Sequence, residues 1–426
     1  MSSLYDRIFV ELTTTNVRIV RIYEYLYIRL ICILVVTETW FMKTILVTGG
    51  AGYIGSHTVK ELIKEGYSVV VLDNLEAGHK EAVDPAATLE IVDLKDKSKI
   101  LSVFDKYKID AVIDFAAYLA VGESMEDPGK YLKNNVLNFI NLLDAMVEKK
   151  CKYIIKSSTA AVYGNPTKES DIPWKEDFVE NYQPGESALL DGKWQGEKVA
   201  GDQFFNKFIA AYENATKNRP ELQLTESEKS KLKIPLSIYG LTKLLDEILL
   251  KKYDEISKIK SVSLRYFNVC GADPSGEMGE DKPKPTTLMI MAIYQLLGKI
   301  SQLNILGKDY DTPDGTAIRD YIHPSDLSIG HVLALENLIQ TNQSDIFNLG
   351  TGKGSSVLEV IEAVERASGK KVKTVDKPKR SGDAIISIAD PSKAEKILNW
   401  KARYSLDDMA KTAWKWHNSH PSGYKI

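Results

Sequence analysis

Short apolar runs alternate with helix-like stretches from Met42 to about Tyr163. Such runs, bounded by turn-forming residues, are typical of buried strands, and apolar positions three and four apart are typical of helices packed on them. The strands expected from the runs are residues 44–48, 68–73, 89–92, 111–115, 153–157 and 261–265. The helices expected between them include residues 55–65, 97–106 and 131–149. Because strands that alternate with helices are joined by right-handed crossovers, this order predicts an α/β fold with a doubly wound parallel sheet.

The pattern changes beyond Ser275, where Pro and Gly become more frequent and the alternation less regular. This change of pattern indicates a smaller C-terminal cap domain that is built from several separate segments of the chain. Within it, residues 347–350 and a helical stretch at 357–368 indicate that the cap is also α/β. We therefore expect a first domain over residues 42–274 and mainly a cap over residues 275–426, with some cap segments returning to the first domain.

Two segments do not follow the alternation. Residues 23–41 are rich in aromatic and β-branched residues, but Arg29 interrupts them and only residues 30–36 are continuously apolar, whereas a membrane span needs about 20 such residues. We interpret residues 1–41 as an extension outside the fold that arises from an upstream start codon; the alternative is a short membrane-associating segment. Residues 179–233 are charged, helical in character and poor in strand formers. They predict a partly helical insertion, which either loops out at the surface or packs over a cleft.

A glycine-rich turn follows the first expected strand. Gly49, Gly52 and Gly55 lie three residues apart, immediately before a helical pattern. In a Rossmann fold, such glycines permit a tight turn and close backbone approach, and the helix N-terminus offers free N–H groups to a dinucleotide pyrophosphate. Asp73 ends the second expected strand. Because a carboxylate there accepts hydrogen bonds from a ribose 2′-hydroxyl and repels a 2′-phosphate, the sequence favours NAD over NADP.

Composition and charge exclude several other classes of protein. The chain has 426 residues, of which 44% are hydrophobic and 27% charged, and its net charge is −3. These values are ordinary for a globular protein and give no basic surface for nucleic acid. Cys32, Cys151 and Cys270 are scattered, with no metal-ligand spacing. We expect no metal site, no nucleic-acid or membrane partner, and a reducing, cytoplasmic location.

Three polar residues form a candidate reaction centre. Tyr239 and Lys243 are four residues apart, so they lie on one face of a helix. A lysine ammonium, aided by the positive charge of a nicotinamide, favours the phenolate and brings the tyrosine towards useful basicity. Thr159 follows an expected strand at the carboxyl end of the sheet, where ligands of such folds bind. Together they form a proton relay suited to hydride transfer at a carbinol carbon.

Longer motifs make the chain resemble the extended short-chain dehydrogenase/reductase family and, within it, the UDP-glucose 4-epimerases. The matching strings are TGGAGYIGSH at 48–57, VGES at 121–124, NNV at 134–136, SSTAAVYG at 157–164, LRYFNVCGADPSGEMGED at 264–281, DGTAIRDYIHPSDL at 314–327 and RSGD at 380–383. The resemblance covers residue 42 to about residue 416, apart from the insertion. It implies an isomerase of galactose metabolism that works as a homodimer with bound NAD. The implied reaction is reversible C-4 inversion of UDP-galactose and UDP-glucose through a 4-keto intermediate.

The resemblance also implies roles for individual residues. The catalytic group comprises Thr159, Tyr239 and Lys243. The NAD-binding group comprises Gly49, Gly52, Tyr53, Ile54, Gly55, Asp73, Asn74, Asp93, Leu94, Phe115, Ala116, Ala117, Asn134, Ser157, Lys243 and Phe267. The group that binds the UDP-sugar comprises Thr159, Tyr239, Asn268, Thr287, Leu288, Arg319, Arg380, Asp383 and Ser387.

Several positions bear on alternatives within the family. Related nucleotide-sugar 4,6-dehydratases use an Asp-Glu pair after the active-site Thr, where this chain has Ala160 and Ala161. A further alternative is a non-catalytic NAD-binding scaffold, against which the catalytic residues are all present. Asp114 stands where the family usually has His, so we expect its carboxylate to be turned away from the cofactor or paired. Leu119 stands where the family usually has Lys or Ser, which removes a polar contact to NAD. Ser387 is small at a position beside C-2 of the sugar, so the pocket is expected to admit N-acetylated UDP-hexoses as well.

Overall fold

The structure is a computed structural model that describes residues 43–164, 166, 171–181, 202–282, 285–379 and 384–424, with the side chains of residues 202–204 left out. The predicted extension at residues 1–41 therefore lies outside the described residues, as does the middle of the predicted insertion.

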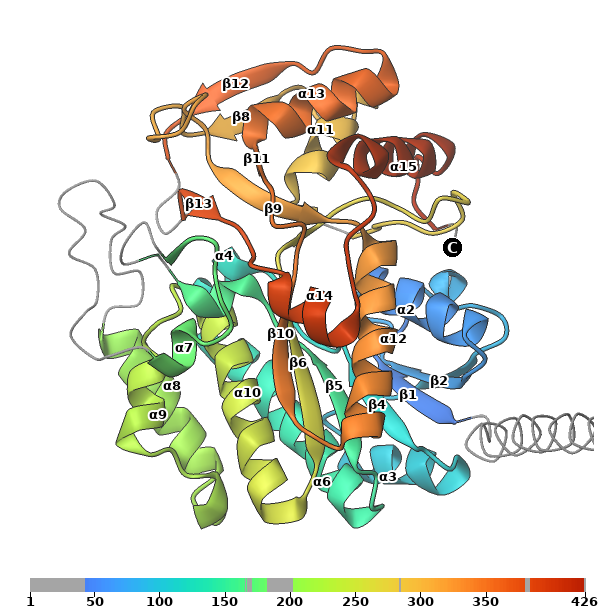
Figure 1. The fold of residues 1–426 in the computed structure, drawn as a ribbon, viewed down its shortest axis with the longest axis vertical. Helices are drawn as coiled ribbons and strands as arrows, with labels where there is room; N and C mark the ends of the chain where they lie inside the picture. The colour runs from blue at the N-terminus through green and yellow to red at the C-terminus, as the bar shows by residue number, and fades with distance from the viewer. Residues whose placement is uncertain are drawn as a thin grey trace, which may run out of the picture. The chain divides into compact units, whose positions relative to one another are not determined.

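A seven-stranded parallel sheet forms the centre of the chain (Figure 1). Its order is β10-β6-β5-β4-β1-β2-β3, and each neighbouring pair is parallel. The strands are β1 (Thr44–Thr48), β2 (Ser68–Asp73), β3 (Thr88–Ile91), β4 (Ala111–Asp114), β5 (Tyr153–Ser157), β6 (Lys260–Tyr266) and β10 (Asp345–Leu349). This order confirms the predicted doubly wound α/β fold.

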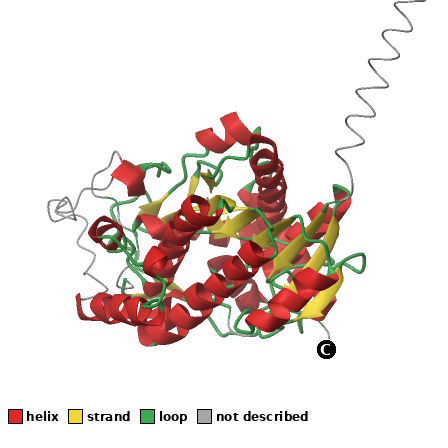
Figure 2. Cartoon of the chain, turned by 90° about the horizontal axis from the view of Figure 1, so that it is seen from below, coloured by secondary structure: helices red, strands yellow, loops and turns green. Residues whose placement is uncertain are grey.

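Helices cover both faces of this sheet, as the view from below also shows (Figure 2). On one face lie α2 (Tyr53–Lys64) and α12 (Pro324–Thr341), and on the other lie α3 (Lys97–Lys106), α6 (Asn138–Glu148) and α10 (Ile238–Ser257). Successive strand residues point to opposite faces. Ile45 and Val47 of β1 accordingly join the cluster with α2 and α12, whereas Leu46 joins the cluster with α6 and α10.

Two sequence predictions need correction. Residues 347–350 were expected in the cap, but Phe347–Leu349 belong to β10, which pairs with β6 in the main sheet. The single helix expected over residues 131–149 begins instead with a π-helical segment, η2 (Leu132–Leu137), and continues as α6. Local apolar periodicity contains no information about which distant strand an apolar run will pair with, and it does not distinguish a π-helical turn from an α-helical one.

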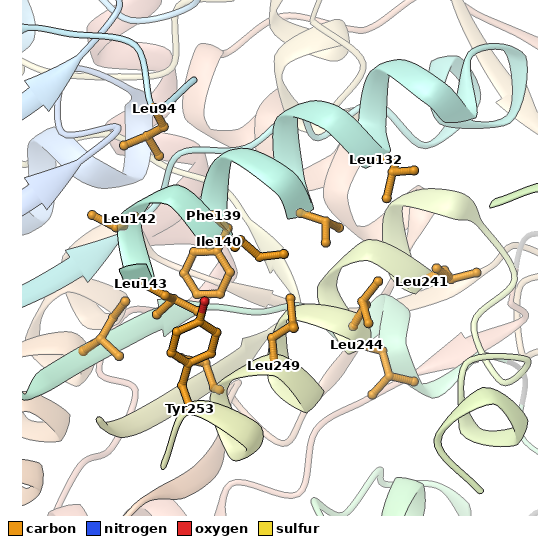
Figure 3. Packing of buried hydrophobic residues seen from close by; sticks show 14 of the residues in the cluster. Leu94, Leu132, Phe139, Ile140, Leu142, Leu143, Leu241, Leu244, Leu249 and Tyr253 are labelled. Atoms are coloured by element: carbon orange, nitrogen blue, oxygen red, sulfur yellow. The ribbon is translucent and has the colours of Figure 1, made fainter. Parts of the chain in front are cut away.

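The described part of the insertion is helical, as predicted, and it packs on the main domain. It contains α7 (Phe178–Asn181), α8 (Asp202–Ala215), η5 (Pro220–Leu222) and α9 (Glu226–Lys231). Its buried apolar side chains share a core cluster with the leucines of α10. Figure 3 shows the inner part of that cluster, in which Leu241, Leu244 and Leu249 of α10 face the side chains of η2 and α6. The described part of the insertion therefore shares the core of α10 and does not loop out at the surface.

A second set of elements forms the smaller cap. Strands β7 (Asn268–Val269), β9 (Ile318–Ile322), β11 (Gly354–Ser356) and β13 (Ile386–Ser387) make a four-stranded sheet, and β8 (Leu303–Leu306) pairs with β12 (Thr374–Lys377). Helices α11 (Leu288–Leu296), α13 (Val357–Ser368) and α15 (Leu406–Ser419) enclose a separate apolar cluster. Outside the cap, the described residues also form the short helices α4 (Val121–Glu126), α5 (Pro128–Tyr131) and α14 (Ser392–Leu398) and the 3-10 segments η1 (Lys80–Ala82) and η3 (Ala160–Tyr163). None of the helices in the described residues combines the length and apolar character needed to cross a bilayer.

Candidate active site

The glycine-rich turn between β1 and α2 is closed so tightly that side chains do not fit. A Cβ on Gly49 would lie 2.8 Å from the backbone nitrogen of Ala116, and one on Gly55 would lie 2.2 Å from the carbonyl oxygen of Gly49. Gly49 also has a positive φ of 69°. Gly52 caps α2 without a side-chain hydrogen bond, and the first turn of the helix contains no acidic residue. Helix N–H groups left uncapped in this way suit an anion, so the turn fits the pyrophosphate of NAD.

Asp73 stands beside this turn and organises it. Its Oδ2 accepts a hydrogen bond of 3.0 Å from the N–H of Ala51, and its Oδ1 accepts one of 2.8 Å from the N–H of Leu75. Burial raises the pKa of Asp73. Because a carboxylate has about four acceptor sites, lone pairs remain for ribose hydroxyls. Asn74 donates a 3.3 Å hydrogen bond to Asp93, which brings the three polar residues expected around the adenosine into one group.

The expected floor of the cofactor site follows β4. Phe115 packs against His331 with ring centres 4.7 Å apart, and the N–H of Ala116 donates to Asp114. Ala117 leads into Tyr118, whose N–H donates to Asn135 at 2.8 Å. The side chain of Leu94 is buried in the apolar cluster next to α3 and α6.

Asn135 was missed in the sequence analysis, although it lies in the NNV string. Its amide contacts both the N–H and the carbonyl of Tyr118 and donates to the Thr242 hydroxyl, and it accepts a 3.0 Å hydrogen bond from Asn134. It thereby ties the loop after β4 to α10. Both asparagines lie in the π-helical segment η2, and such segments are frequent at functional sites.

The three candidate catalytic residues meet where β5 ends and α10 begins. Thr159 caps the short helix η3 (Ala160–Tyr163), and its hydroxyl hydrogen-bonds to Tyr239 in the first turn of α10. Lys243, one turn later, donates a 2.9 Å hydrogen bond to the carbonyl of Ser157. Thr159 and Tyr239 are 80 residues apart in the chain, and the insertion between them does not prevent this contact.

Gly240 makes this approach possible. A Cβ at that position would lie 2.6 Å from the carbonyl oxygen of Ala161. The N–H of Tyr239 is also bonded to the buried Ser124 hydroxyl at 3.1 Å, and Ser237 caps the helix. Ser124, in the VGES string, is a second residue missed in the sequence analysis. The backbone at Tyr239 is therefore held from both sides.

Burial dominates the proton affinity of the two ionisable catalytic groups. It raises the pKa of Tyr239 to about 12, while the hydrogen bond from Thr159 and the charge of Lys156 act to lower it. Burial also lowers the pKa of Lys243, as does Lys156, while Asp246 opposes that effect. Because its pKa is raised, the Tyr239 phenol needs a further positive charge before it works as a base near neutral pH. Two further predicted NAD-binding residues lie nearby: the Ser157 hydroxyl forms a short hydrogen bond with Tyr266, and Phe267 is buried.

The departures from the family pattern have clear structural counterparts. The Asp114 carboxylate, expected to be turned away or paired, forms an ion pair of 2.5 Å with Lys156. Lys156 and its second partner Asp246 were also missed, because neither belongs to a matched motif. Leu119 is 45% exposed, so this site has an apolar side chain where the family usually has a polar one.

Residues expected to bind the UDP-sugar gather on the cap sheet. Asn268 of β7 pairs with Tyr321 of β9, and Ser387 of β13 pairs with Arg319 of β9. The Arg319 guanidinium donates to the carbonyls of Ile318 and Ile385. Separately, Thr287 is the N-cap residue of α11 and makes no side-chain cap hydrogen bond, so the backbone of Leu288 stands at an uncapped helix N-terminus. Arg380 and Asp383 lie outside the described residues.

Comparisons with known proteins agree with this geometry. The sequence profile of the NAD dependent epimerase/dehydratase family matches residues 45–188, and the profile of GDP-mannose 4,6 dehydratase matches residues 219–413. The chain is 39% identical to the UDP-glucose 4-epimerase of Lactobacillus helveticus over 382 residues, which are 89% of this chain and 99% of that protein.

Solved structures extend the likeness to the fold. A crystal structure of UDP-glucose 4-epimerase is similar with a TM-score of 0.72 and 36% identity, over 90% of this chain and 100% of that one. The UDP-glucose 4-epimerase of Bifidobacterium longum, solved in complex with NAD+ and UDP, is similar with a TM-score of 0.70 and 34% identity, over 90% and 100%. Identity at this level, over almost the full length of these relatives, shows that the chain belongs to the UDP-glucose 4-epimerase family.

Proposed function

We propose that this chain catalyses the reversible, NAD-dependent inversion of C-4 in UDP-galactose and UDP-glucose through a 4-keto sugar. The observation that carries the proposal is the convergence of Thr159, Tyr239 and Lys243 at the carboxyl end of β5. Ligands of doubly wound sheets bind at this edge. The uncapped glycine-rich turn of the same sheet suits the dinucleotide.

Each catalytic residue has a distinct part in this reaction. Tyr239 removes the proton from the 4′-hydroxyl and later returns one, and Thr159 aligns the phenol by the hydrogen bond that also lowers its pKa. Lys243 stabilises the phenolate by its charge and is anchored by the Ser157 carbonyl. When bound, NAD supplies the acceptor for the C-4 hydride and the donor that returns it. The chain therefore contributes position, proton transfer and electrostatics.

A 4,6-dehydratase is the second candidate, because residues 219–413 match the profile of GDP-mannose 4,6 dehydratase. Water elimination needs an acid and a base close to the sugar. The residues after Thr159 are Ala160 and Ala161, which form the first turn of η3 and move no protons. Epimerisation is favoured for this reason. Mass spectrometry of the product separates the two reactions, because only dehydration removes the mass of water from the sugar nucleotide.

We also propose that residues 42–274 mainly bind NAD and that residues 275–426 mainly bind the UDP-sugar. The NAD-binding roles given above to Gly49, Asp73, Asn134 and the other residues of that group rest on the resemblance and on their positions around the glycine-rich turn. The same reasoning assigns Asn268, Arg319 and Ser387 to the substrate, supported by their pairing within one cap sheet. A guanidinium fork matches the oxygens of a diphosphate, which supports the role of Arg319.

The small side chain of Ser387 supports a wider substrate range. Where a bulky aromatic side chain would fill the space beside C-2, a hydroxymethyl group leaves room for an acetamido group. We therefore include UDP-N-acetylglucosamine and UDP-N-acetylgalactosamine among the proposed substrates.

We further propose a homodimer in the cytoplasm. The homodimer rests on the family resemblance alone. The location is supported by Cys151 and Cys270, both free and buried, which fit a reducing compartment. Light scattering after gel filtration tests the first point, since a dimer has twice the chain mass of 47.7 kDa. A species with the mass of one chain would contradict it.

The decisive experiment is a coupled assay for UDP-glucose formed from UDP-galactose, run on the wild type and on Tyr239→Phe. Loss of the phenol is expected to lower turnover by roughly 10²–10⁴-fold, which is typical of general acid–base catalysis. Tyr253→Phe, which removes a phenol from the same helix away from the reaction centre, is the matched control and keeps its activity. Wild-type turnover in Tyr239→Phe would refute the assignment, and an inactive wild type with bound NAD would indicate a scaffold instead.

A further inference from the structure

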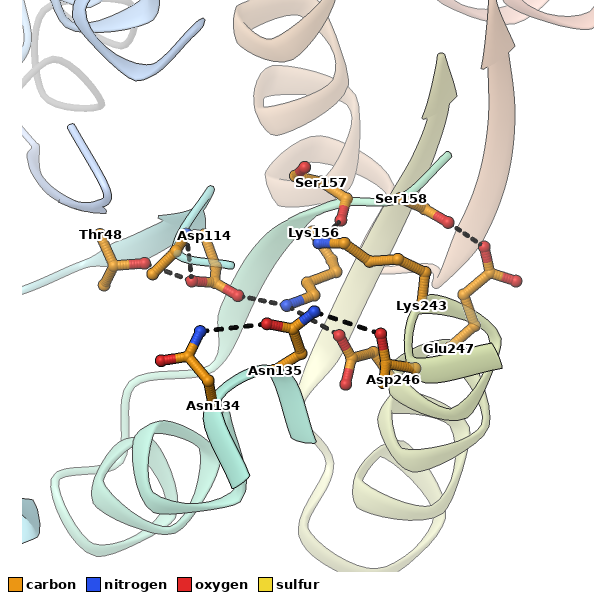
Figure 4. A network of polar contacts seen from close by, with 12 residues as sticks. Thr48, Asp114, Asn134, Asn135, Lys156, Ser157, Ser158, Lys243, Asp246 and Glu247 are labelled. Atoms are coloured by element: carbon orange, nitrogen blue, oxygen red, sulfur yellow. Dashed lines mark hydrogen bonds and ion pairs between the residues drawn. The ribbon is translucent and has the colours of Figure 1, made fainter. Parts of the chain in front are cut away.

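A row of polar and charged side chains lies beside the catalytic Lys243 (Figure 4). Thr48, Asp114 and Lys156 are register partners across β1, β4 and β5, so they lie side by side on one face of the sheet. That face is the one covered by α6 and α10, because the alternate residues Leu46, Val112 and Ile154 join the core cluster of those helices. Asp246 approaches the row from α10, one helical turn after Lys243.

The contacts in this row are short and excluded from solvent. The Lys156 ammonium lies 2.5 Å from Asp114 Oδ2 and 3.0 Å from Asp246 Oδ2, and these side chains are at most 1% exposed. Thr48 and the N–H of Ala116 donate to the other oxygen of Asp114. The oxygens of Asp246 receive no well-aligned hydrogen bond from the described residues. Asp114 is thus fully paired, whereas Asp246 interacts with its surroundings mainly through its charge.

Charge balance links this cluster to Lys243. Two buried carboxylates face one ammonium at Lys156, and an uncompensated buried charge is strongly unfavourable. The next cation is Lys243, which lies on the same face of α10 as Asp246. Arg265 of β6 does not serve this purpose, because it is paired with Glu247 at 2.6 Å. With Asp114, Lys156 and Asp246 all ionised, the cluster is neutral when Lys243 is charged. Burial raises the pKa of Asp246 to about 6, so protonation of Asp246 is the other way to neutralise the cluster.

We infer that Lys156 and Asp246 are positioning residues for the proposed epimerase reaction, with opposite effects on the catalytic pair. Asp246 favours retention of the protons on Tyr239 and Lys243, and Lys156 favours their loss. Together the two side chains set the pH range in which Tyr239 is ionised while Lys243 is charged. The inference rests on the proposed function, but the protonation of Tyr239 is measurable without turnover.

Among the described residues, four charged groups act on Lys243. From β4 and β5 come Asp114 and Lys156, and from α10 itself come Asp246 and Glu247. Lys156 acts to lower the pKa of both Lys243 and Tyr239, whereas Asp246 acts to raise both. The hydroxyl of Thr159 acts to lower the pKa of Tyr239.

Two variants with opposite expected effects test the inference. Asp246→Asn keeps the shape of the side chain and leaves Lys156 paired with Asp114. Removing this negative charge is expected to move both limbs of the pH profile of kcat/KM to lower pH by about one unit, which is at the low end of the shifts that a nearby charge causes. The double variant Asp114→Asn, Lys156→Met removes one charge of each sign and leaves Asp246 unopposed beside Lys243. Both limbs are then expected to move to higher pH.

The control is Glu255→Gln, which removes a carboxylate from the exposed, far end of α10. Solvent screening is expected to leave its profile at the wild-type position. The second readout is the phenolate absorbance of Tyr239, taken as the difference between each protein and the same protein carrying Tyr239→Phe, titrated with its bound NAD. Its midpoint is expected to move in the same direction as the kinetic limbs.

Opposite shifts in the two variants support the inference. Shifts in one common direction, or a fall in kcat/KM with unmoved limbs and an unmoved phenolate midpoint, overturn it in favour of a purely structural cluster. If no variant and no wild type epimerises UDP-galactose, the proposed function fails, and the absorbance titration still decides the inference.

Discussion

Phe208→Ala tests whether the insertion is an integral part of the core. The four side chains Phe205, Phe208, Ile209 and Tyr212 recur at helical spacing along α8 and are all buried against the α10 cluster. Phe208 is 3% exposed. Replacing a buried Phe by Ala costs about 3–5 kcal/mol in free energy of unfolding, from lost apolar burial and from the cavity that remains. Since folded domains are stable by only about 5–15 kcal/mol, the variant is expected to unfold at a much lower urea concentration.

Polar contacts make the same segment hard to detach. Arg219, after α8, forms a two-pronged hydrogen bond with Asp144 of α6 and also reaches the Tyr253 hydroxyl of α10. Glu228 of α9 pairs with Lys252 of α10 at 2.9 Å. Buried apolar contacts and these polar contacts therefore both hold α8 and α9 against the main domain. Deletion of residues 179–233 is expected to expose the leucines of α10 to solvent, and not merely to remove a surface loop.

The assay is urea unfolding followed by tryptophan fluorescence, with Lys207→Ala as the control on the exposed side of α8. The control is expected to change the free energy of unfolding by less than about 0.5 kcal/mol. Folded Phe208→Ala is expected to keep the turnover of the control, because α8 contributes none of the candidate catalytic residues. A change below about 1 kcal/mol in Phe208→Ala would mean that the insertion is not part of the cooperative core, and the reasoning would be wrong.

Three further predictions follow from single positions. Gly240→Ala forces α10 away from the Thr159 turn, since its Cβ would lie 2.6 Å from the Ala161 carbonyl oxygen. This variant is expected to lose about 1–3 kcal/mol of stability and to have a lower kcat. The control Gly129→Ala meets only ordinary contacts and is expected to change neither quantity. Ser387→Tyr is expected to abolish turnover of N-acetylated UDP-hexoses and largely spare UDP-galactose, measured by chromatography of both product pairs; a wild type that converts UDP-galactose but no N-acetylated substrate contradicts the pocket argument. Burial lowers the pKa of His57 and His331 to about 4, so the unfolded chain binds more protons below about pH 6.5, and each histidine is expected to remove about 2 kcal/mol of stability at about pH 5. The free energy of urea unfolding, measured from about pH 6.5 down to about pH 5, gives this loss. If His331→Asn loses as much stability over this range as the wild type does, His331 is not a source of the loss.

Local sequence was sufficient to predict most elements of the main domain. The apolar runs at 44–48, 68–73 and 153–157 coincide with β1, β2 and β5, because a buried parallel strand needs a short continuous apolar run. The glycines at 49, 52 and 55 predicted the cofactor turn, since a positive φ and close backbone contacts restrict what residues fit there. The positive φ of Gly49 and the contact of Gly55 with Gly49 act within a few residues, so the local sequence expresses them directly.

The tertiary structure decided what depends on pairing between distant segments. It placed β10 beside β6, packed the insertion on α10, and brought Thr159 to Tyr239 across 80 residues. Asp114, which by itself was only an unusual carboxylate near a cofactor, became one end of a buried ion-pair cluster when the register of β4 and β5 placed it opposite Lys156. Strand register and helix packing are set by the summed burial of the whole core, so no short stretch of sequence contains them.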